Sequence, residues 1–578
     1  MSEHFKINPN RSFQTICLNK YFVITAILIA VACTVGIGNV VAVMTWHVPV
    51  PYFDEWDQFP QMIALRDADF STSNVFTYAW AQHNEHRIVI PKFIYFLDMT
   101  YFDYKGYFPL VCIFIFQTMV VGMLAWLLVS NKNYLLAKLL FISFAIVAVF
   151  DLTQYENFLS TFQTSFVGCF AFAVTALVLY AKYVESERRA YLFSAVIFAS
   201  LSSLSLASGL FIWLALALLA YFIRAKHYVQ SFAFVGTFLM FLLLYLHGYI
   251  SPAIHANPVD SLIHHPLLVL NFLAIWLGNI AGTVSAAKLL GSIGLFALIV
   301  LVVYLVRGEK RTHHVQIYTL LGICLFVLMA GFVISLGRIN FGVEQAMASR
   351  YSTPVLLFWM GLLGSFLLVA LESGRALLIR AAVMFVLAAY VGLLAHHSRG
   401  ENAMIAFQNQ LSQGYLGITT GAYNNRPQLL LSVYPIPGLI IDKINLLRSH
   451  HLSSFSASRA KPFEMGSLFS SLGNHHRQCM GHVNSVSAVA KDTYQITGWA
   501  WNEASSSFPE WIYLVKGGKV IGLGKPGIQR PDVITAIPSI NKIRVGWQGF
   551  ARDANDLKLD NIEAYLVTRD GVYCQFVP

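Results

Sequence analysis

The sequence predicts a polytopic α-helical membrane protein with about eleven transmembrane helices and a small C-terminal β-sandwich domain. Only 12% of its 578 residues are charged, whereas soluble domains carry about 25%. Apolar runs of about 20 residues, long enough to cross a bilayer core of about 30 Å, recur along the first two thirds of the chain. From residue 480 they give way to short alternating runs separated by Gly, Asn and Asp, a pattern typical of strands and turns.

One further apolar segment, 267–284, affects the number of spans. If it crossed the membrane, the basic loop 307–314 would lie on the outer side, against the usual distribution of Lys and Arg. We therefore expect 267–284 to form a re-entrant or surface helix on the outer side. The predicted spans are 22–44, 108–130, 134–151, 162–181, 190–206, 208–223, 229–249, 290–306, 316–336, 352–371 and 376–396.

The basic residues of the short loops give the orientation. With the N-terminus in the cytoplasm, each short basic loop falls on the cytoplasmic side. The net charge of +10 therefore reflects membrane topology, with the lipid bilayer and not a nucleic acid as the partner. The residues concerned are Lys132, Lys138, Lys182, Arg188, Arg189, Arg224, Lys226, Arg307, Lys310, Arg311, Arg375 and Arg380.

The chain divides into a transmembrane module at 1–396 with a long outer loop at 45–107, a helical and loop segment at 397–478, and the β-sandwich at 479–578. Cys479 and Cys574 bracket the sandwich and predict a disulfide in an oxidising compartment, with two free thiols as the alternative. The tryptophans of this domain either fill its core or stack on sugar rings. They are Trp499, Trp501, Trp511 and Trp547.

Acidic residues cluster in "PYFDEWDQFP" (51–60), directly after the first span. Asp54, Glu55 and Asp57 are flanked by aromatic residues, Trp56 among them, which favour the membrane interface. A carboxylate held there would act as general base for a hydroxyl acceptor, or would hold a divalent cation such as Mg²⁺ or Mn²⁺. A solvated loop is the simple alternative.

A second polar motif, "QHNEHRIVIPK" (82–92), lies in the same outer loop. The spacing of His83, Glu85 and His86 matches no standard zinc motif. Arg87 and Lys92 suit an anionic group such as a phosphate.

Two more polar segments follow spans on the same side. In "QYENFLSTFQTSF" (154–166), the residues Glu156, Asn157, Ser160 and Gln163 would line one face of a helix, toward a water-filled cavity. In "GRINFGVEQAMASRYSTP" (337–354), Arg338 and Arg350 are outer-side arginines that would bind a lipid phosphate or anchor in the headgroups.

Together, "FDEWD", "ENF…FQ" and "SRYSTP" resemble features of the GT-C superfamily of membrane glycosyltransferases, in particular bacterial members that modify O-antigen and other surface glycans. The resemblance covers residues 20–460 and leaves the β-domain outside. It implies a bacterial inner-membrane enzyme whose C-terminal domain is periplasmic. It also implies a polyprenyl-phosphate-linked sugar as donor, a periplasmic glycan or lipid-linked molecule as acceptor, and a separate donor synthase and flippase as partners.

The resemblance also assigns roles to residues. Asp54 would deprotonate the acceptor hydroxyl for an inverting attack, with Glu55 as the second choice and Asp57 as a supporting residue. The donor phosphate would be held by Arg350, with its neighbour Tyr351, and by Arg338, Arg87 and Lys92. The acceptor and sugar would contact Trp56, His83, Glu85, His86, Glu156, Asn157 and Gln163.

Two other functions stay open. A transporter or flippase for lipid-linked glycans would need polar residues through the depth of the membrane and usually an internal repeat, which the sequence lacks. A glycan polymerase or ligase shares the large outer loops and arginines, but does not need a sharp acidic cluster after the first span.

Overall fold

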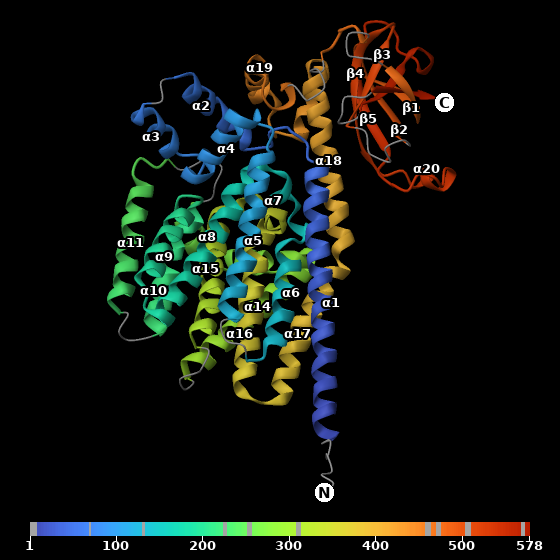
Figure 1. Cartoon of the computed structure of the whole chain (residues 1–578). Helices are drawn as coiled ribbons and strands as arrows, with labels where there is room; N and C mark the ends of the chain where they lie inside the picture. The colour runs from blue at the N-terminus through green and yellow to red at the C-terminus, as the bar shows by residue number, and fades with distance from the viewer. Residues whose placement is uncertain are drawn as a thin grey trace.

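The computed structural model describes residues 9–68, 71–129, 133–223, 228–250, 257–307, 314–456, 464–469, 475–502, 510–567 and 573–577. It consists of a helical bundle, a group of short helices at one end of the bundle, and a C-terminal β-domain beside that end (Figure 1). We call this end the loop face and define it by residues 46–106, 151–163 and 338–351. The N-terminus lies at the opposite end of the bundle (Figure 1).

Long apolar helices confirm a polytopic membrane protein. In the described part of the chain, nine helical segments are long and apolar enough to cross a membrane. They coincide with nine of the eleven predicted spans. The helices are α1 (Pro9–Thr45), α5 (Tyr107–Val129), α6 (Leu135–Val149), α8 (Thr164–Ser186), α11 (Tyr228–Leu246), α14 (Val284–Arg307), α15 (His314–Arg338), α16 (Ser352–Ser373) and α17 (Ala376–Ala395).

The two remaining predicted spans form shorter helices. They are α9 (Arg189–Ser203) and α10 (Ile212–Ile223), separated by the 3₁₀ helix η3 (Ala207–Phe211). Ser203 stabilises this break because its hydroxyl donates to the Gly209 carbonyl at 3.1 Å and accepts from the Trp213 indole at 3.0 Å. A total of eleven spans therefore stays a prediction. Among the basic loop residues, Lys132, Arg224, Lys226, Lys310 and Arg311 lie outside the described residues.

The segment 267–284, predicted to be re-entrant, falls largely on α13 (Pro266–Leu277), and α12 (Pro258–His264) precedes it with a bend of 107° between the two helices. Before the bend, the Gln82 side chain donates to the Ile250 carbonyl at 2.6 Å. After it, Asn279 donates to the Ala348 carbonyl at 3.3 Å. These contacts tie residues before and after the helix pair to the loop face, and a re-entrant path of 267–284 stays a prediction.

Small residues allow α13 to pack closely on α14. A Cβ atom on Gly291 would lie 1.8 Å from the Ala274 carbonyl oxygen, so only glycine fits at this contact. Close backbone approach at small residues is the usual packing mode of helices in membranes.

Short helices form the loop face. Ser71 caps α3 by accepting from the Asn74 amide at 3.2 Å, and Asp103 ends α4 in the left-handed conformation with φ of 58°. After α17 the chain continues as α18, which extends beyond the loop face and lies beside the β-domain (Figure 1). The elements are α2 (Glu55–Asp67), α3 (Thr72–Trp80), α4 (Val89–Phe102), η1 (Leu152–Gln154), α7 (Tyr155–Leu159), η2 (Thr161–Gln163), η6 (Ile339–Phe341), η7 (Val343–Met347), η8 (Ser349–Tyr351), α18 (His397–Thr420), η10 (Pro427–Ser432), η11 (Pro437–Ile440) and α19 (Ile441–Ser449).

The C-terminal domain is a β-domain, as predicted, but its strands close into one barrel where we expected a sandwich of two sheets. The strand order is β1-β2-β5-β4-β3-β6-β7, and the parallel pairing of β7 with β1 closes it. Gly517 and Gly518 of the "KGGK" turn have positive φ values of 55° and 75°. The strands are β1 (His475–Ala490), β2 (Thr493–Trp501), β3 (Trp511–Lys516), β4 (Lys519–Ile528), β5 (Gly546–Arg552), β6 (Glu563–Val567) and β7 (Tyr573–Val577), with α20 (Pro531–Ala536) after β4.

Both faces of β3 are buried, which explains how the barrel is attached. Ile512 and Leu514 fill the barrel, whereas Trp511 packs outward and stacks on Tyr415 of α18 with ring centroids 4.9 Å apart. Trp501 and Trp547 are buried as well. These three tryptophans therefore belong to cores and interfaces, whereas a sugar-stacking role for the half-buried Trp499 stays a prediction.

The structure joins Cys479 of β1 and Cys574 of β7 in a disulfide, with Cα atoms 5.7 Å apart and a separation of 95 positions in sequence. Because this bond closes a long loop, replacing both cysteines by serine should lower the free energy of unfolding of the barrel by about 4 kcal/mol. Thermal unfolding of the full-length protein, with and without reductant, measures this. Cys112→Ser, at a free cysteine, should leave the midpoint unchanged.

Candidate functional site

Segments far apart in the sequence bring charged side chains together at the loop face. Four carboxylates form what we call the acid cluster, namely Asp54, Asp57, Glu85 and Glu156. Each of the last three is paired with a basic residue.

Glu55 belongs to the structural frame of this site. Its side chain is 4% exposed and accepts from the Ser160 hydroxyl at 2.8 Å and the Phe162 amide at 3.0 Å. Its other carboxylate oxygen accepts from the Tyr52 amide at 3.2 Å. These bonds join the start of α2 to the 160–162 segment. They leave Glu55 poorly placed to serve as the second-choice base.

Asp57 is bound by the segment that follows α18. The Lys443 ammonium forms an ion pair with Asp57, and the Tyr434 hydroxyl donates to the same carboxylate at 3.4 Å. The Phe53 amide also donates to the Val433 carbonyl at 2.9 Å. Residues 427–449 therefore pack beside the acidic motif 51–60. This contact is consistent with a supporting role for Asp57.

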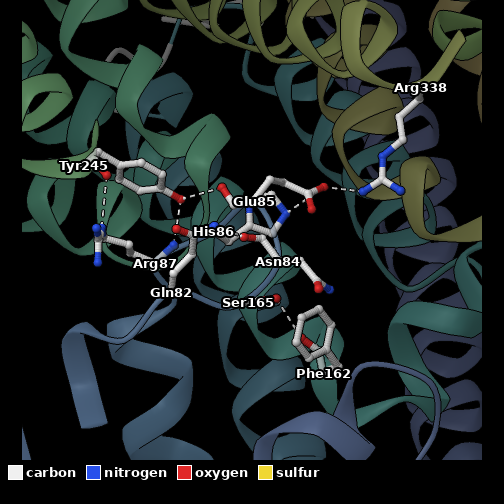
Figure 2. Close-up of polar contacts among 9 residues, drawn as sticks. All are labelled: Gln82, Asn84, Glu85, His86, Arg87, Phe162, Ser165, Tyr245 and Arg338. Atoms are coloured by element: carbon white, nitrogen blue, oxygen red, sulfur yellow. Dashed lines mark hydrogen bonds and ion pairs between the residues drawn. The ribbon is translucent and has the colours of Figure 1, made fainter. Parts of the chain in front are cut away.

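Glu85 lies at the tip of a tight turn and pairs with Arg338 at the end of α15. His86 is also close, with its Nε2 atom 3.5 Å from the Glu85 carboxylate. Figure 2 shows Glu85 between His86 and Arg338, while Arg87 turns the opposite way toward Tyr245. Glu85 therefore faces the site, whereas Arg87, on the other side of the turn, faces α11.

The third polar motif does not form the single helix face that we expected. It is broken into η1, α7 and η2, with Ser160 in extended conformation between the last two. Glu156 and Asn157 instead hold the 349–353 segment. Glu156 accepts from the Arg350 amide at 3.0 Å, and Asn157 donates to the Arg350 carbonyl at 3.0 Å and the Thr353 hydroxyl at 2.7 Å.

The hydrogen bonds of Glu156 and Asn157 hold Arg350 at the loop face. Its guanidinium lies 3.7 Å from the Glu156 carboxylate and stacks over the Tyr351 ring at 5.3 Å. The side chain is 29% exposed, so an anion has access to it. Tyr351 itself is buried against Phe166 and Trp276 and acts as the support of Arg350.

Asp54 is the exception in the acid cluster. In the described part of the chain, its carboxylate forms no ion pair, and it is half-buried just before α2. Burial is the largest cause that raises the pKa of Asp54, followed by the Glu85 charge; hydrogen bonding to Asn84 and the Arg350 charge act in the opposite direction. A carboxylate with a raised pKa and no bound cation is a suitable general base.

Arg87 and Lys92 are not placed to bind a donor phosphate. The Arg87 guanidinium donates to the backbone carbonyls of Trp80, Tyr245 and His247. Lys92 is fully buried and donates to the Tyr78 and Ala81 carbonyls at 2.8 and 2.7 Å, and burial lowers its pKa to about 8. Both residues hold the outer loop together.

Arg87→Lys should therefore destabilise the protein by about 3 kcal/mol, because lysine keeps the charge but cannot bond three carbonyls at once. The thermal unfolding midpoint in detergent measures the loss. Binding of a prenyl phosphate to the folded protein should be unchanged, and the exposed Arg448→Lys should leave the midpoint near that of the wild type. Weaker binding of the prenyl phosphate with a normal midpoint would restore the phosphate role of Arg87.

The residues predicted to contact the acceptor and the sugar differ in their exposure to solvent. Trp56 is fully buried and packs on Phe59 at 5.8 Å, so it does not face an acceptor. His83 is 6% exposed against Phe162, and burial lowers its pKa to about 3, so it is neutral. Gln163 is half-buried at the end of η2. Of the predicted acceptor residues, Glu85, His86 and Glu156 lie in or beside the acid cluster.

Sequence reasoning missed several residues of the site. Tyr434 and Lys443 come from the C-terminal segment, and Asn84 provides the side chain next to Asp54. Asn84 also has a positive φ of 47°, a conformation that asparagine tolerates. The only signal for it was the "HN" pair within a polar loop. For Lys443 there was none, because it lies in an ordinary amphipathic stretch.

No set of three or more His, Cys, Asp or Glu side chains within the described residues is arranged to hold a metal ion. A requirement for Mg²⁺ or Mn²⁺ stays a prediction that only added metal or a chelator can test.

No protein-family model matches this chain, and neither a curated protein nor a solved structure matches it.

Proposed function

We propose that this protein is an inverting membrane glycosyltransferase that moves a sugar from a polyprenyl-phosphate-linked donor to a glycan or lipid-linked acceptor. The observation that carries the proposal is the contrast within the acid cluster. Asp57, Glu85 and Glu156 are each paired with a cation, whereas Asp54 has none in the described part of the chain.

In this mechanism Asp54 takes the proton of the acceptor hydroxyl. The acceptor oxygen attacks the anomeric carbon as the bond from that carbon to the phosphate oxygen breaks, and the electron pair leaves with the polyprenyl phosphate. Arg350, which Glu156 and Tyr351 hold in place, faces the negative charge that develops on the leaving phosphate. Arg338 is a second cation on the same face.

The proposal places the protein in a bacterial inner membrane with the loop face toward the periplasm. There the donor would come from a separate synthase and flippase, and the acceptor would be a surface glycan of the O-antigen type. Support comes from the apolar helices and from a loop face that gathers the acid cluster, the arginines and a disulfide-bonded domain.

A mass comparison of the surface glycan from source cells with and without the protein tests this function. The expected result is the loss of one sugar-sized increment per repeat in cells that lack the protein. A shortened chain of unchanged repeats would indicate a polymerase. An unchanged glycan, together with translocation of a lipid-linked sugar by vesicles containing the purified protein, would indicate a flippase.

A further inference from the structure

The segment that carries Arg350 is fixed to the bundle through its backbone. The Arg350 amide donates to the Glu156 carboxylate at 3.0 Å, and the Arg350 carbonyl accepts from the Asn157 side chain at 3.0 Å. Just before it, the Ser349 hydroxyl donates to the Thr153 carbonyl at 2.8 Å. Both polar backbone groups of Arg350 are therefore bonded, so its Cα atom has a defined position.

The bond from Asn157 is the end of a chain of buried hydrogen bonds. The Asn157 amide nitrogen also donates to the Thr353 hydroxyl at 2.7 Å, and the Thr353 hydroxyl donates to the side-chain oxygen of Gln154 at 2.6 Å. That oxygen accepts a second bond, from the Gln117 amide nitrogen at 3.1 Å. All four side chains belong to residues that are at most 5% exposed, so they form one polar network inside the protein.

The direction of each bond in this network follows from the backbone of α6. The Gln154 amide nitrogen donates to the Val149 and Ala148 carbonyls at 2.7 and 3.3 Å, and a carbonyl can only accept. The oxygen of the same amide must therefore face Thr353, whose hydroxyl has to donate because that oxygen cannot. The Thr353 oxygen is then left to accept from Asn157, so each group in the chain has a fixed role.

Gln117 connects the network to a membrane-spanning helix. It lies in the middle of α5, directly after the apolar run "LVCIFIF" (110–116). A polar side chain at such a depth is costly unless it is hydrogen-bonded, and residues of this kind usually serve a function. Its partner here is Gln154, and the network that they share leads from the membrane helix to the accessible Arg350.

We propose that Thr353 is a positioning residue for the proposed transfer, which holds Arg350 where its guanidinium meets the donor phosphate. The inference rests on the proposed function, because it takes Arg350 as the group that binds this phosphate. Thr353 is buried, so it acts through Asn157 and the Arg350 carbonyl, and Gln154 holds Thr353 in turn.

A fixed backbone matters because Arg350 reaches the site through a long side chain. Its guanidinium is 29% exposed and lies 3.7 Å from the Glu156 carboxylate and 5.3 Å from the centre of the Tyr351 ring. A shift of the Arg350 Cα atom would move the guanidinium away from both contacts. Charge stabilisation needs donors that are aligned before the reaction, and a misplacement of about 1 Å can lower the rate by about 10²-fold.

Binding of a short-chain prenyl phosphate to the full-length protein in detergent tests the inference. Thr353→Val keeps the shape of the side chain without the hydroxyl and should weaken binding by about 5-fold, the effect of one hydrogen bond. Thr353→Ser keeps the hydroxyl and should restore most of the binding. The matched control is Thr175→Val on α8, where a fully buried hydroxyl donates to the Ala171 carbonyl of the same helix at 2.9 Å. This control should bind as the wild type does.

A double variant separates positioning from a general loss of structure. Arg350→Gln should itself weaken binding, and Thr353→Val should then have no further effect, because the network acts through Arg350. The thermal unfolding midpoint of each variant reports its fold. Should Thr353→Val not fold, Gln117→Leu at the far end of the network takes its place, with a smaller loss in the same direction.

Wild-type binding by the folded Thr353→Val protein would overturn the inference, and so would an equal loss with and without Arg350. Absence of binding by the wild-type protein would overturn it as well. The two proposals fail separately. Wild-type protein that binds the prenyl phosphate but transfers no sugar contradicts the glycosyltransferase, whereas the comparison of the variants stands without any turnover.

Discussion

Asp54→Asn is expected to abolish sugar transfer while the protein stays folded. Asparagine keeps the shape of the side chain but cannot accept the acceptor proton, so the rate should fall by about 10²- to 10⁴-fold. Transfer of labelled sugar from the lipid-linked donor by purified protein measures the rate, and the thermal unfolding midpoint reports the fold. The matched control is Asp67→Asn at the exposed end of the same helix α2, which should keep full activity.

The pH dependence of the wild-type enzyme follows from the same residue. Asp54 must be ionised to act as base, so the rate should rise with pH through the pKa of Asp54. Because burial and the Glu85 charge raise that pKa, this rise should lie above the usual carboxyl range. Normal transfer by Asp54→Asn, or a rate that is flat with pH, would move the base to another residue.

Glu55→Ala should reduce stability and not the activity of the folded protein, although Glu55 is the neighbour of Asp54. Removing this buried carboxylate leaves the Ser160 hydroxyl and the amides of Phe162 and Tyr52 without their acceptor. The free energy of unfolding should fall by about 3 to 5 kcal/mol, seen as a lower midpoint and a smaller yield of folded protein. Glu55→Gln keeps one acceptor oxygen and should cost less.

The ratio of activity to folded protein separates the two roles. In Glu55→Gln that ratio should stay near the wild-type value, whereas in Asp54→Asn it should vanish. Glu55→Ala with a wild-type midpoint and no activity would instead make Glu55 a catalytic group, and the assignment within "FDEWD" would have to change.

The helices and the position of the acidic motif could be predicted from sequence because local chemistry determines them. Long apolar runs must be helical in a membrane, and the acids follow the first of these runs directly. The short α9 and α10 were less predictable, because the hydroxyl of Ser203 stabilises a break inside what looks like apolar sequence. The strands of the last domain were also visible, but not the pairing of β7 with β1 that closes the barrel.

The function of each charge depends on contacts between distant residues, which no single stretch of sequence contains. Arg87 and Arg338 looked equally suited to a phosphate, yet one is buried among carbonyl groups and the other is accessible beside Glu85. The partner of Asp57 is Lys443, 386 residues further along the chain. A single sequence contains no covariation that would connect such pairs.

The contacts of the C-terminal segment have a consequence for the synthesis of the protein. Trp46, at the end of the first membrane helix, lies under the guanidinium of Arg544 at 3.9 Å, and Arg544 also binds Gln408 of α18 at 2.9 Å. Asp57 similarly has no cation until Lys443 has been made. The acidic motif of a nascent chain thus stays without this cationic partner while the 386 residues from Asp57 to Lys443 are synthesised.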